Sequence, residues 1–122
     1  RTAQIHGACP FLPELLGFEV IRALPGDARD LATSEGPHVA AFLLDGPRPG
    51  SGTAWAWEGV GAELAGRPVW LAGGLTPENV QQAIARVRPA GVDVASGVER
   101  DGSIDPERVG AFVRAARQEG TR

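Results

Sequence analysis

The sequence predicts an α/β protein built around a parallel sheet. Short apolar runs rich in β-branched residues alternate with helical patterns along all 122 residues. The runs are nearly continuous in their hydrophobicity, which is typical of parallel strands that are covered on both faces. About five strand–helix units therefore follow one another, and this alternation favours a parallel α/β architecture that forms one domain or part of one.

Five strands are expected, and each coincides with one of the apolar runs. They cover residues 3–5, 18–24, 39–44, 68–72 and 91–95. Helices are expected between and after the strands. The patterns of the first three helices are weak, and they cover residues 10–16, 27–34 and 57–65.

The last two helices share a start signal, which is a capping residue followed by proline. Thr76 is expected to cap one helix with Pro77 in its first position, and Asp105 and Pro106 repeat the device. Apolar residues then recur at helical spacing, so each helix has one apolar face. The faces consist of Val80, Ala83, Ile84 and Val87 in the first helix and of Val109, Phe112, Val113 and Ala116 in the second.

The composition narrows the classes of partner. The formal net charge of −3 is small and the charges are not clustered, which argues against nucleic acid and against an anionic membrane. No apolar run approaches the roughly 18 residues of a transmembrane helix, and no basic, apolar leader suggests secretion. The single cysteine, Cys9, cannot form a disulfide within the chain, so we expect a cytosolic protein.

The loops that follow the strands are the candidate site, because parallel α/β folds bind ligands beyond the carboxyl ends of their strands. His6 ends the first strand in "QIHG", where it either contacts a substrate or is hydrogen-bonded into the rim of the fold. Asp45 follows apolar residues in "FLLDGPRPGSG", which should partly desolvate its carboxyl group and suit it to general-acid catalysis. The alternative is an Asp-Gly turn that only ends the strand. The glycine-rich segment behind Asp45 weakens that alternative, because it resembles a ligand-contacting loop.

The next two loops carry small residues that let a backbone approach a ligand closely. Gly73 and Gly74 precede a helix whose unpaired amides and dipole would suit a phosphate, and Ser96 and Gly97 repeat the small residues in the following loop. Two such loops in succession indicate phosphate binding, because the last two loops of a (β/α)8 barrel often share one phosphate site. Asp93 lies inside the fifth apolar run, where its partner is either a substrate hydroxyl or an arginine.

Five segments together resemble the phosphoribosylanthranilate isomerases of tryptophan biosynthesis, in order and in spacing, across nearly the whole chain. They are "QIHG", "VIRAL", "FLLDGPRPGSG", "VWLAGGLTPENVQQAI" and "GVDVASGVERDGSID". The resemblance implies a (β/α)8 TIM barrel, of which residues 1–122 would form about the last five β/α units, strands four to eight. The first three units of the family's barrel have no counterpart in these residues.

The resemblance also implies a reaction. The family catalyses the Amadori rearrangement of N-(5-phosphoribosyl)anthranilate to 1-(2-carboxyphenylamino)-1-deoxyribulose 5-phosphate, with no cofactor and no metal. A general acid protonates the ribose ring oxygen, the ring opens to an imine, and a general base removes a proton from the neighbouring carbon. By position, Asp45 resembles the acid, and His6 and Asp93 resemble residues that contact the substrate. The residues that resemble the phosphate cradle are Gly73, Gly74, Ser96 and Gly97.

One part of the family's machinery has no match. Its general base is a cysteine in a Lys-Ile-Cys-Gly motif on the first strand, and no such motif occurs here. Cys9 follows the "QIHG" strand and does not correspond to that base. The family's anthranilate-binding arginine, which belongs to its second unit, is absent too. We therefore expect this chain alone to be inactive.

Two functions are compatible with this pattern. The chain is either part of an isomerase or a non-catalytic half-barrel that binds a phosphorylated ligand or a partner protein. Other phosphate-binding barrels, such as indole-glycerol-phosphate synthase or a pentose-phosphate epimerase, are disfavoured by the "LLDG…PGSG" segment and by the missing metal-ligand histidine pattern of the epimerases. Since five of eight barrel strands leave two open edges, we expect self-association or pairing with the missing amino-terminal segment.

Overall fold

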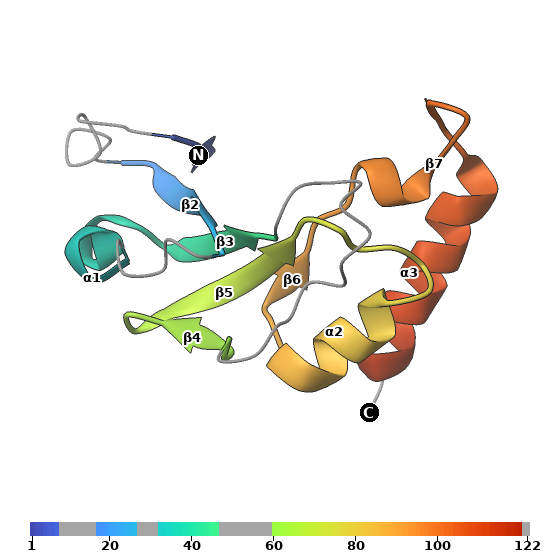
Figure 1. Ribbon diagram of the computed structural model, residues 1–122. Coiled ribbons are helices and arrows are strands. Elements are labelled where there is room, and N and C mark those ends of the chain that lie inside the picture. Colours follow the sequence, from blue (N-terminus) through green and yellow to red (C-terminus); the bar gives the residue numbers. More distant parts are fainter. Residues whose placement is uncertain (8–16, 27–31, 47–59, 121–122) are drawn as a thin grey trace.

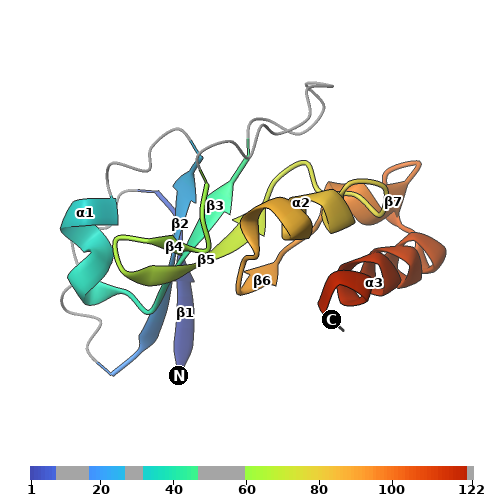
Figure 2. The same ribbon diagram turned by 90° about the horizontal axis from the view of Figure 1, so that it is seen from below.

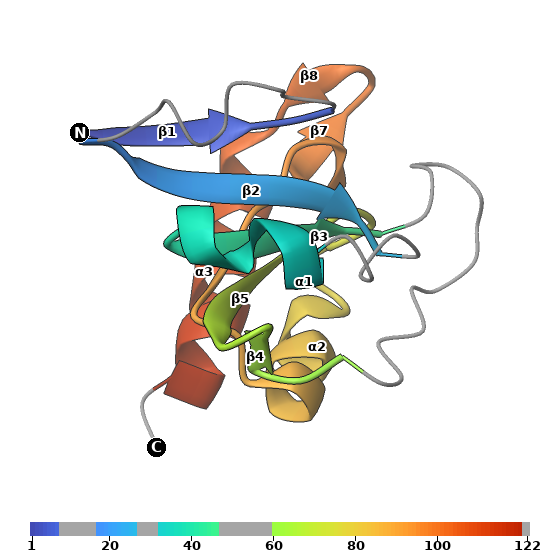
Figure 3. The ribbon, with the colours of Figure 1, turned by 90° about the vertical axis from the view of Figure 1, so that its left-hand side faces the viewer.

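The computed structural model describes residues 1–7, 17–26, 32–46 and 60–120. Its centre is a sheet of parallel strands that lie side by side in chain order (Figure 1). These strands are β1 (Thr2–Ile5), β2 (Glu19–Pro25), β3 (Ala41–Asp45), β5 (Arg67–Ala72) and β6 (Gly91–Val92). Figure 3 shows the first four stacked in that order. The order is that of a barrel wall, whereas in a doubly wound sheet the strand order reverses at a switch point.

All five predicted strands are present, but the last is shorter than predicted. β6 ends at Val92, and the N–H of Asp93 makes one further hydrogen bond, to the carbonyl of Leu71 at 2.8 Å. The chain then turns into a short 3₁₀ helix, η4 (Ser96–Val98). Ser96 and Gly97, the small residues that suggested a ligand loop, therefore lie in a 3₁₀ helix beyond the end of the strand.

The helices lie on one face of the sheet. They are α1 (Ala32–Glu35), which continues into the 3₁₀ turn η3 (Gly36–His38), α2 (Val80–Val87) and α3 (Pro106–Gly120). In Figure 2, α3 lies beyond α2 and farther from the strands. The apolar residues of α1 and α2 pack on the same set of strand side chains, so within the described residues the helices cover a single face.

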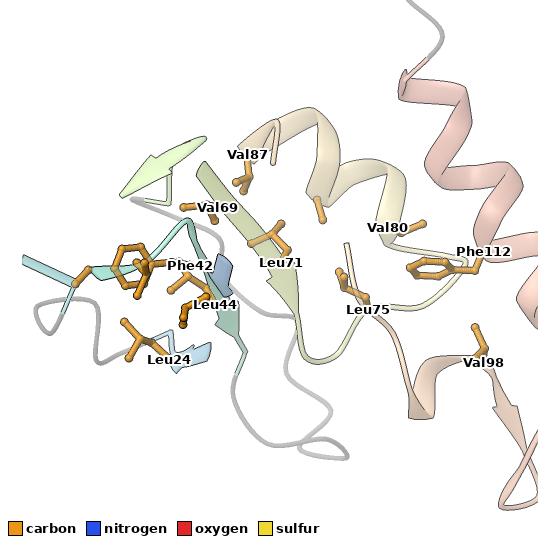
Figure 4. Close-up of a cluster of buried hydrophobic side chains, with 14 residues drawn as sticks. Leu24, Phe42, Leu44, Val69, Leu71, Leu75, Val80, Val87, Val98 and Phe112 are labelled. Carbon is orange, nitrogen blue, oxygen red and sulfur yellow. The ribbon is translucent and has the colours of Figure 1, made fainter. Parts of the chain in front are cut away.

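The main core fills the space between the strands and the helices. Figure 4 shows it running from Leu24 and Phe42 through Leu71 to Val80 and Phe112. The opposite face of the sheet carries a second, smaller cluster of three buried side chains, Ala23, Leu43 and Ala72. Alternate residues of β2, β3 and β5 are thus buried on opposite faces, which explains why these runs are continuously apolar.

The predicted helix over residues 57–65 is wrong in its described part, residues 60–65. β4 (Glu63–Leu64) instead pairs antiparallel with the start of β5. The turn between them uses Ala65 and Gly66 with φ angles of 50° and 76°, and two positive φ angles in succession are typical of a type I′ hairpin turn. Val60 and Leu64 have helical spacing, but both pack on the core from an extended segment. The predicted helix over 10–16 lies outside the described residues, and that over 27–34 is described only from Ala32, where α1 begins.

α2 begins three residues later than predicted, because residues 77–79 form a separate turn. Thr76 nevertheless caps that turn: its Oγ1 accepts a hydrogen bond from the N–H of Glu78 at 3.2 Å. Asn79 reciprocates, since its Oδ1 accepts from the N–H of Thr76 at 2.8 Å. This exchange has the form of a capping box with asparagine in place of glutamate.

α3 begins at Pro106, as predicted, and Oδ1 of Asp105 accepts a hydrogen bond from the N–H of Glu107 at 3.0 Å. Its predicted apolar face is only partly buried. Phe112 lies in the core, whereas Val109 and Val113 are exposed. Within the described residues no helix is both long enough and apolar enough to cross a membrane.

Candidate active site

The seven predicted site residues lie at one end of the sheet. The loops after β3, β5 and β6 enclose a cavity of about 140 Å³. Six of the predicted residues line it, namely Asp45, Gly73, Gly74, Asp93, Ser96 and Gly97. A second cavity of about 330 Å³ lies at the ends of β1 and β2 and is lined by His6 and again by Asp45. Asp45 therefore belongs to both cavities.

The first glycine of the double-glycine loop is required by Asp45. Gly73 has a φ of 81°, and a Cβ atom at this position would overlap Oδ1 of Asp45 and the backbone nitrogen of Gly46. The backbone beside the acid is also fixed, because the N–H of Gly46 donates to the carbonyl of Ala72 at 2.9 Å and the N–H of Gly26 donates to that of Asp45 at 2.8 Å. The half-buried carboxylate thus has a defined place directly beside the loop.

The second glycine is different. Gly74 also has a positive φ, 69°, but among the residues that the structure describes no atom lies within 4 Å of the place where its Cβ would be. The carbonyl of Gly74 accepts a hydrogen bond from Nδ2 of Asn79 at 2.8 Å, which ties the loop to the turn behind it. Close packing on Asp45 and Gly46 therefore requires glycine at position 73, whereas Gly74 borders open space at the cavity.

The amides at the start of the α2 region do not point freely at the site, contrary to the prediction. Those of Thr76 and Glu78 donate to side-chain oxygens of the turn, and that of Asn79 donates to the carbonyl of Thr76 at 3.2 Å. Pro77 has no N–H to offer. Among the described residues, the glycine loop itself and the neighbouring loop after β6 remain as sources of donors for an anion.

The loop after β6 packs tightly on the loop after β5. A Cβ atom on Gly97 would overlap the carbonyl oxygen of Leu75, so only glycine permits this approach of the two backbones. Leu75 is itself fully buried in the main core. The contact places Ser96 and Gly97 next to Gly73 and Gly74 along one cavity wall.

Asp93 is placed differently from the prediction. Residues 91–95 are predicted to form a strand that could bury this acid. In the structure β6 ends at Val92, one residue before Asp93, and Asp93 is exposed. In the described part of the chain, arginine ion pairs involve Glu35, Glu78 and Asp105, and none involves Asp93. Its place on the cavity lining leaves it available to a ligand.

His6 is exposed just beyond β1 and has a side-chain neighbour. The amide Nε2 of Gln4 lies 2.8 Å from Nε2 of the imidazole, within hydrogen-bonding distance. A buried arginine supports the same strand. Arg22 forms an ion pair with Glu35 of α1, and its Nη1 donates to the carbonyl of Ile5 at 3.3 Å.

Three supporting residues were missed from the sequence. Arg22 could have been found, because it shares a strand face with Val20 and Leu24 and a charge there needs a partner. Asn79 stands at the reciprocal position of a capping box. The third residue is Arg108 of α3, whose side chain reaches back to the loops of the site and gave no signal in its local pattern. No group of three metal-binding side chains occurs among the residues that the structure describes.

A family model described as N-(5'phosphoribosyl)anthranilate (PRA) isomerase matches residues 2–115. The chain belongs to the phosphoribosylanthranilate isomerase family. Its relatives include the N-(5'-phosphoribosyl)anthranilate isomerase of Moorella thermoacetica, which is 48% identical over an alignment covering 94% of this chain and 55% of that protein. The assignment excludes the other phosphate-binding barrels considered from the sequence.

Solved structures agree with this family assignment. TrpF from Jonesia denitrificans is 38% identical, with a TM-score of 0.73 over 98% of this chain and 60% of that one. A phosphoribosyl anthranilate isomerase in complex with reduced 1-(o-carboxyphenylamino)-1-deoxyribulose 5-phosphate is 30% identical, with a TM-score of 0.71 over 96% of this chain and 59% of that one. The chain thus spans only 55–60% of the length of these three relatives.

Proposed function

We propose that this chain is the part of a phosphoribosylanthranilate isomerase that carries the general acid and the phosphate site. In the complete barrel it would isomerise N-(5-phosphoribosyl)anthranilate in tryptophan biosynthesis. The observation that carries the proposal is the contact between Asp45 and Gly73, which places a carboxyl group beside a glycine loop that is open at Gly74. An acid next to a phosphate site is the arrangement that ring opening of a phosphoribosyl compound needs.

Residues 1–122 correspond, in this proposal, to the last five β/α units, so that β1, β2, β3, β5 and β6 are strands four to eight. Three features support this assignment. The strands follow one another in order, the helices cover one face, and two fifths or more of each matched relative lies outside the matched part.

The substrate's phosphate would bind at the smaller cavity. The residues lining that cavity include no lysine or arginine in the described part of the chain, so its donors there would be the hydroxyl of Ser96 and backbone N–H groups of the two glycine loops. The similar isomerase whose structure contains a reduced phosphorylated product supports this class of ligand. Asp45 would protonate the ribose ring oxygen, and His6 and Asp93 would contact the sugar from the second cavity and from the rim.

A purely binding role fits the cavity less well. Two carboxylates, those of Asp45 and Asp93, line the cavity that would bind the phosphate. Neither acidic side chain attracts a phosphate, so a module that only binds phosphate gains nothing from them. In an isomerase the same carboxyl groups act on the sugar.

The general base would come from outside this chain. The family's Lys-Ile-Cys-Gly motif is absent from the sequence, and Cys9 lies outside the described residues. We therefore propose that the base and the anthranilate-binding arginine belong to the first three units of the barrel. No cofactor or metal enters this mechanism.

Restoring the missing units tests this function. The chain is combined with the first three units of the Moorella thermoacetica relative, and isomerisation is followed by loss of N-(5-phosphoribosyl)anthranilate. We expect no turnover by either part alone and measurable turnover by the complex, because the acid and the base then share one site. A complex that forms without gaining activity would contradict the proposal. Mutation of the cysteine in the added units is the matched control and should abolish the gain.

We expect the chain alone to self-associate or to pair with the missing segment. Among the described residues, β1 pairs with β2 only, and Ile104, Val109 and Val113 are exposed. Open strand edges and apolar faces favour association. Sedimentation velocity over a range of concentrations should show species larger than 12.7 kDa, and adding the missing segment should convert them into a defined complex. A stable, folded monomer that does not bind the added segment would refute this expectation.

A further inference from the structure

One arginine connects the two glycine loops from behind the site. Arg108 lies in the first turns of α3, and both its Nε and its Nη2 donate to the carbonyl oxygen of Gly97, at 3.2 and 3.0 Å. The same guanidinium donates through Nη1 and Nη2 to the two carboxylate oxygens of Glu78, at 3.1 and 3.2 Å. A single side chain therefore holds one group from the loop after β6 and one from the turn after β5.

Both ends of this bridge belong to elements that form the candidate phosphate site. Gly97 lines the smaller cavity, and Glu78 lies in the turn whose Asn79 holds the carbonyl of Gly74. Arg108 itself does not line that cavity but a separate surface groove on α3. Its influence on a ligand would therefore be indirect.

The charge of Arg108 is already matched by its partner. The bidentate pair lowers the pKa of Glu78, chiefly through the hydrogen bonds from the Arg108 side chain. A lowered pKa keeps the carboxylate ionised at neutral pH, and the pair weakens only as the pH falls through that lowered value. The nearly neutral pair adds little long-range attraction for an anion, so its effect is one of geometry.

The geometry matters because a carbonyl oxygen repels a phosphate. The two hydrogen bonds hold the Gly97 carbonyl toward α3, and the same peptide unit's N–H, which belongs to Val98, donates to the carbonyl of Ala95 at 3.3 Å. Without Arg108 the Gly97 peptide could rotate and present its oxygen to the cavity. Charge-assisted hydrogen bonds to a planar guanidinium fix such an orientation better than a single ammonium can.

We propose that Arg108 is a positioning residue for phosphate binding, which orients the Gly97 peptide and joins the two loops into one cradle. This inference rests on the proposed function, because it assigns Arg108 to the same phosphate site. It predicts that Arg108 governs the affinity for the phosphate group without touching it and without taking part in proton transfer.

The test uses the complex of this chain with the missing units and two probes. These are reduced 1-(o-carboxyphenylamino)-1-deoxyribulose 5-phosphate and the same compound without its phosphate, with both affinities measured by calorimetry. In Arg108→Ala we expect roughly a tenfold loss of affinity for the phosphorylated probe, about the value of one charge-assisted hydrogen bond, and no loss for the other probe. In turnover, KM should rise by a similar factor and kcat should change little.

Two further variants separate geometry from charge and from folding. Arg108→Lys keeps the charge but not the planar fork, so we expect it to behave like Arg108→Ala. Arg114→Ala, which removes a positive charge from the same helix and groove, should bind both probes as the wild type does. Full affinity in Arg108→Lys, or unchanged affinity in folded Arg108→Ala, would overturn the inference alone. A wild-type complex that binds neither probe would overturn the proposed function together with it.

Discussion

Asp45→Asn is expected to lower kcat for isomerisation by about 10²- to 10⁴-fold in the complex with the barrel units that we propose complete this chain, the usual contribution of a positioned general acid. Asparagine has nearly the same shape, so it fits beside Gly73, where Oδ1 of Asp45 lies. It carries no acidic proton, however, and cannot protonate the ring oxygen of the substrate. Stopped assays with saturating N-(5-phosphoribosyl)anthranilate measure the loss directly, and the melting temperature should change little.

Asp93→Asn is the matched control for this prediction. It also removes one carboxylate from the smaller cavity, but Asp93 is exposed and stands apart from the Asp45–Gly73 contact. We expect its effect mainly on KM, because the resemblance implies a contact with the substrate. If Asp45→Asn kept kcat within tenfold of the wild type, or if Asp93→Asn were the more damaging change in kcat, Asp45 would not be the acid.

Regular features of the fold were accessible from the sequence because they depend on local patterns. The five strand runs and the cap of α3 by Asp105 are of this kind. Residues 60–65 were misread, since Val60 and Leu64 have the spacing of a helix while the deciding feature is the pair of positive φ angles at Ala65 and Gly66. Alanine gives no signal of such an angle, because it favours helices.

In the candidate site, too, features set by local sequence could be predicted and features set by distant contacts could not. The loops that contain Asp45, Gly73 and Gly97 could be located, since parallel strands bring their carboxyl ends to one edge. The structural reasons for Gly73 and Gly97 could not be predicted, because each depends on a partner far away in the sequence. The role of Arg108 depends on contacts with Gly97 and Glu78, and the latter is 30 positions away. Local periodicity carries no information on such pairings.

The two glycines of "LAGGLTPENV" can be separated experimentally by placing alanine at each. Both have positive φ, so each substitution should cost about 1–2 kcal/mol of stability from backbone strain alone. Gly73→Ala adds the overlap with Asp45 and Gly46, so we expect a larger loss of stability. Urea unfolding of the complex with the missing units measures both changes.

The two variants should also differ in catalysis. In Gly73→Ala the new methyl group displaces the carboxyl group of Asp45, so kcat should fall by a factor approaching that of Asp45→Asn. In Gly74→Ala the methyl group meets no atom of the described residues and borders the cavity, so kcat should be nearly kept and KM should rise. Equal effects of the two substitutions on kcat and KM would mean that only backbone strain matters. In that case neither the packing of Asp45 on Gly73 nor the open space at Gly74 would have a specific effect on kcat or KM.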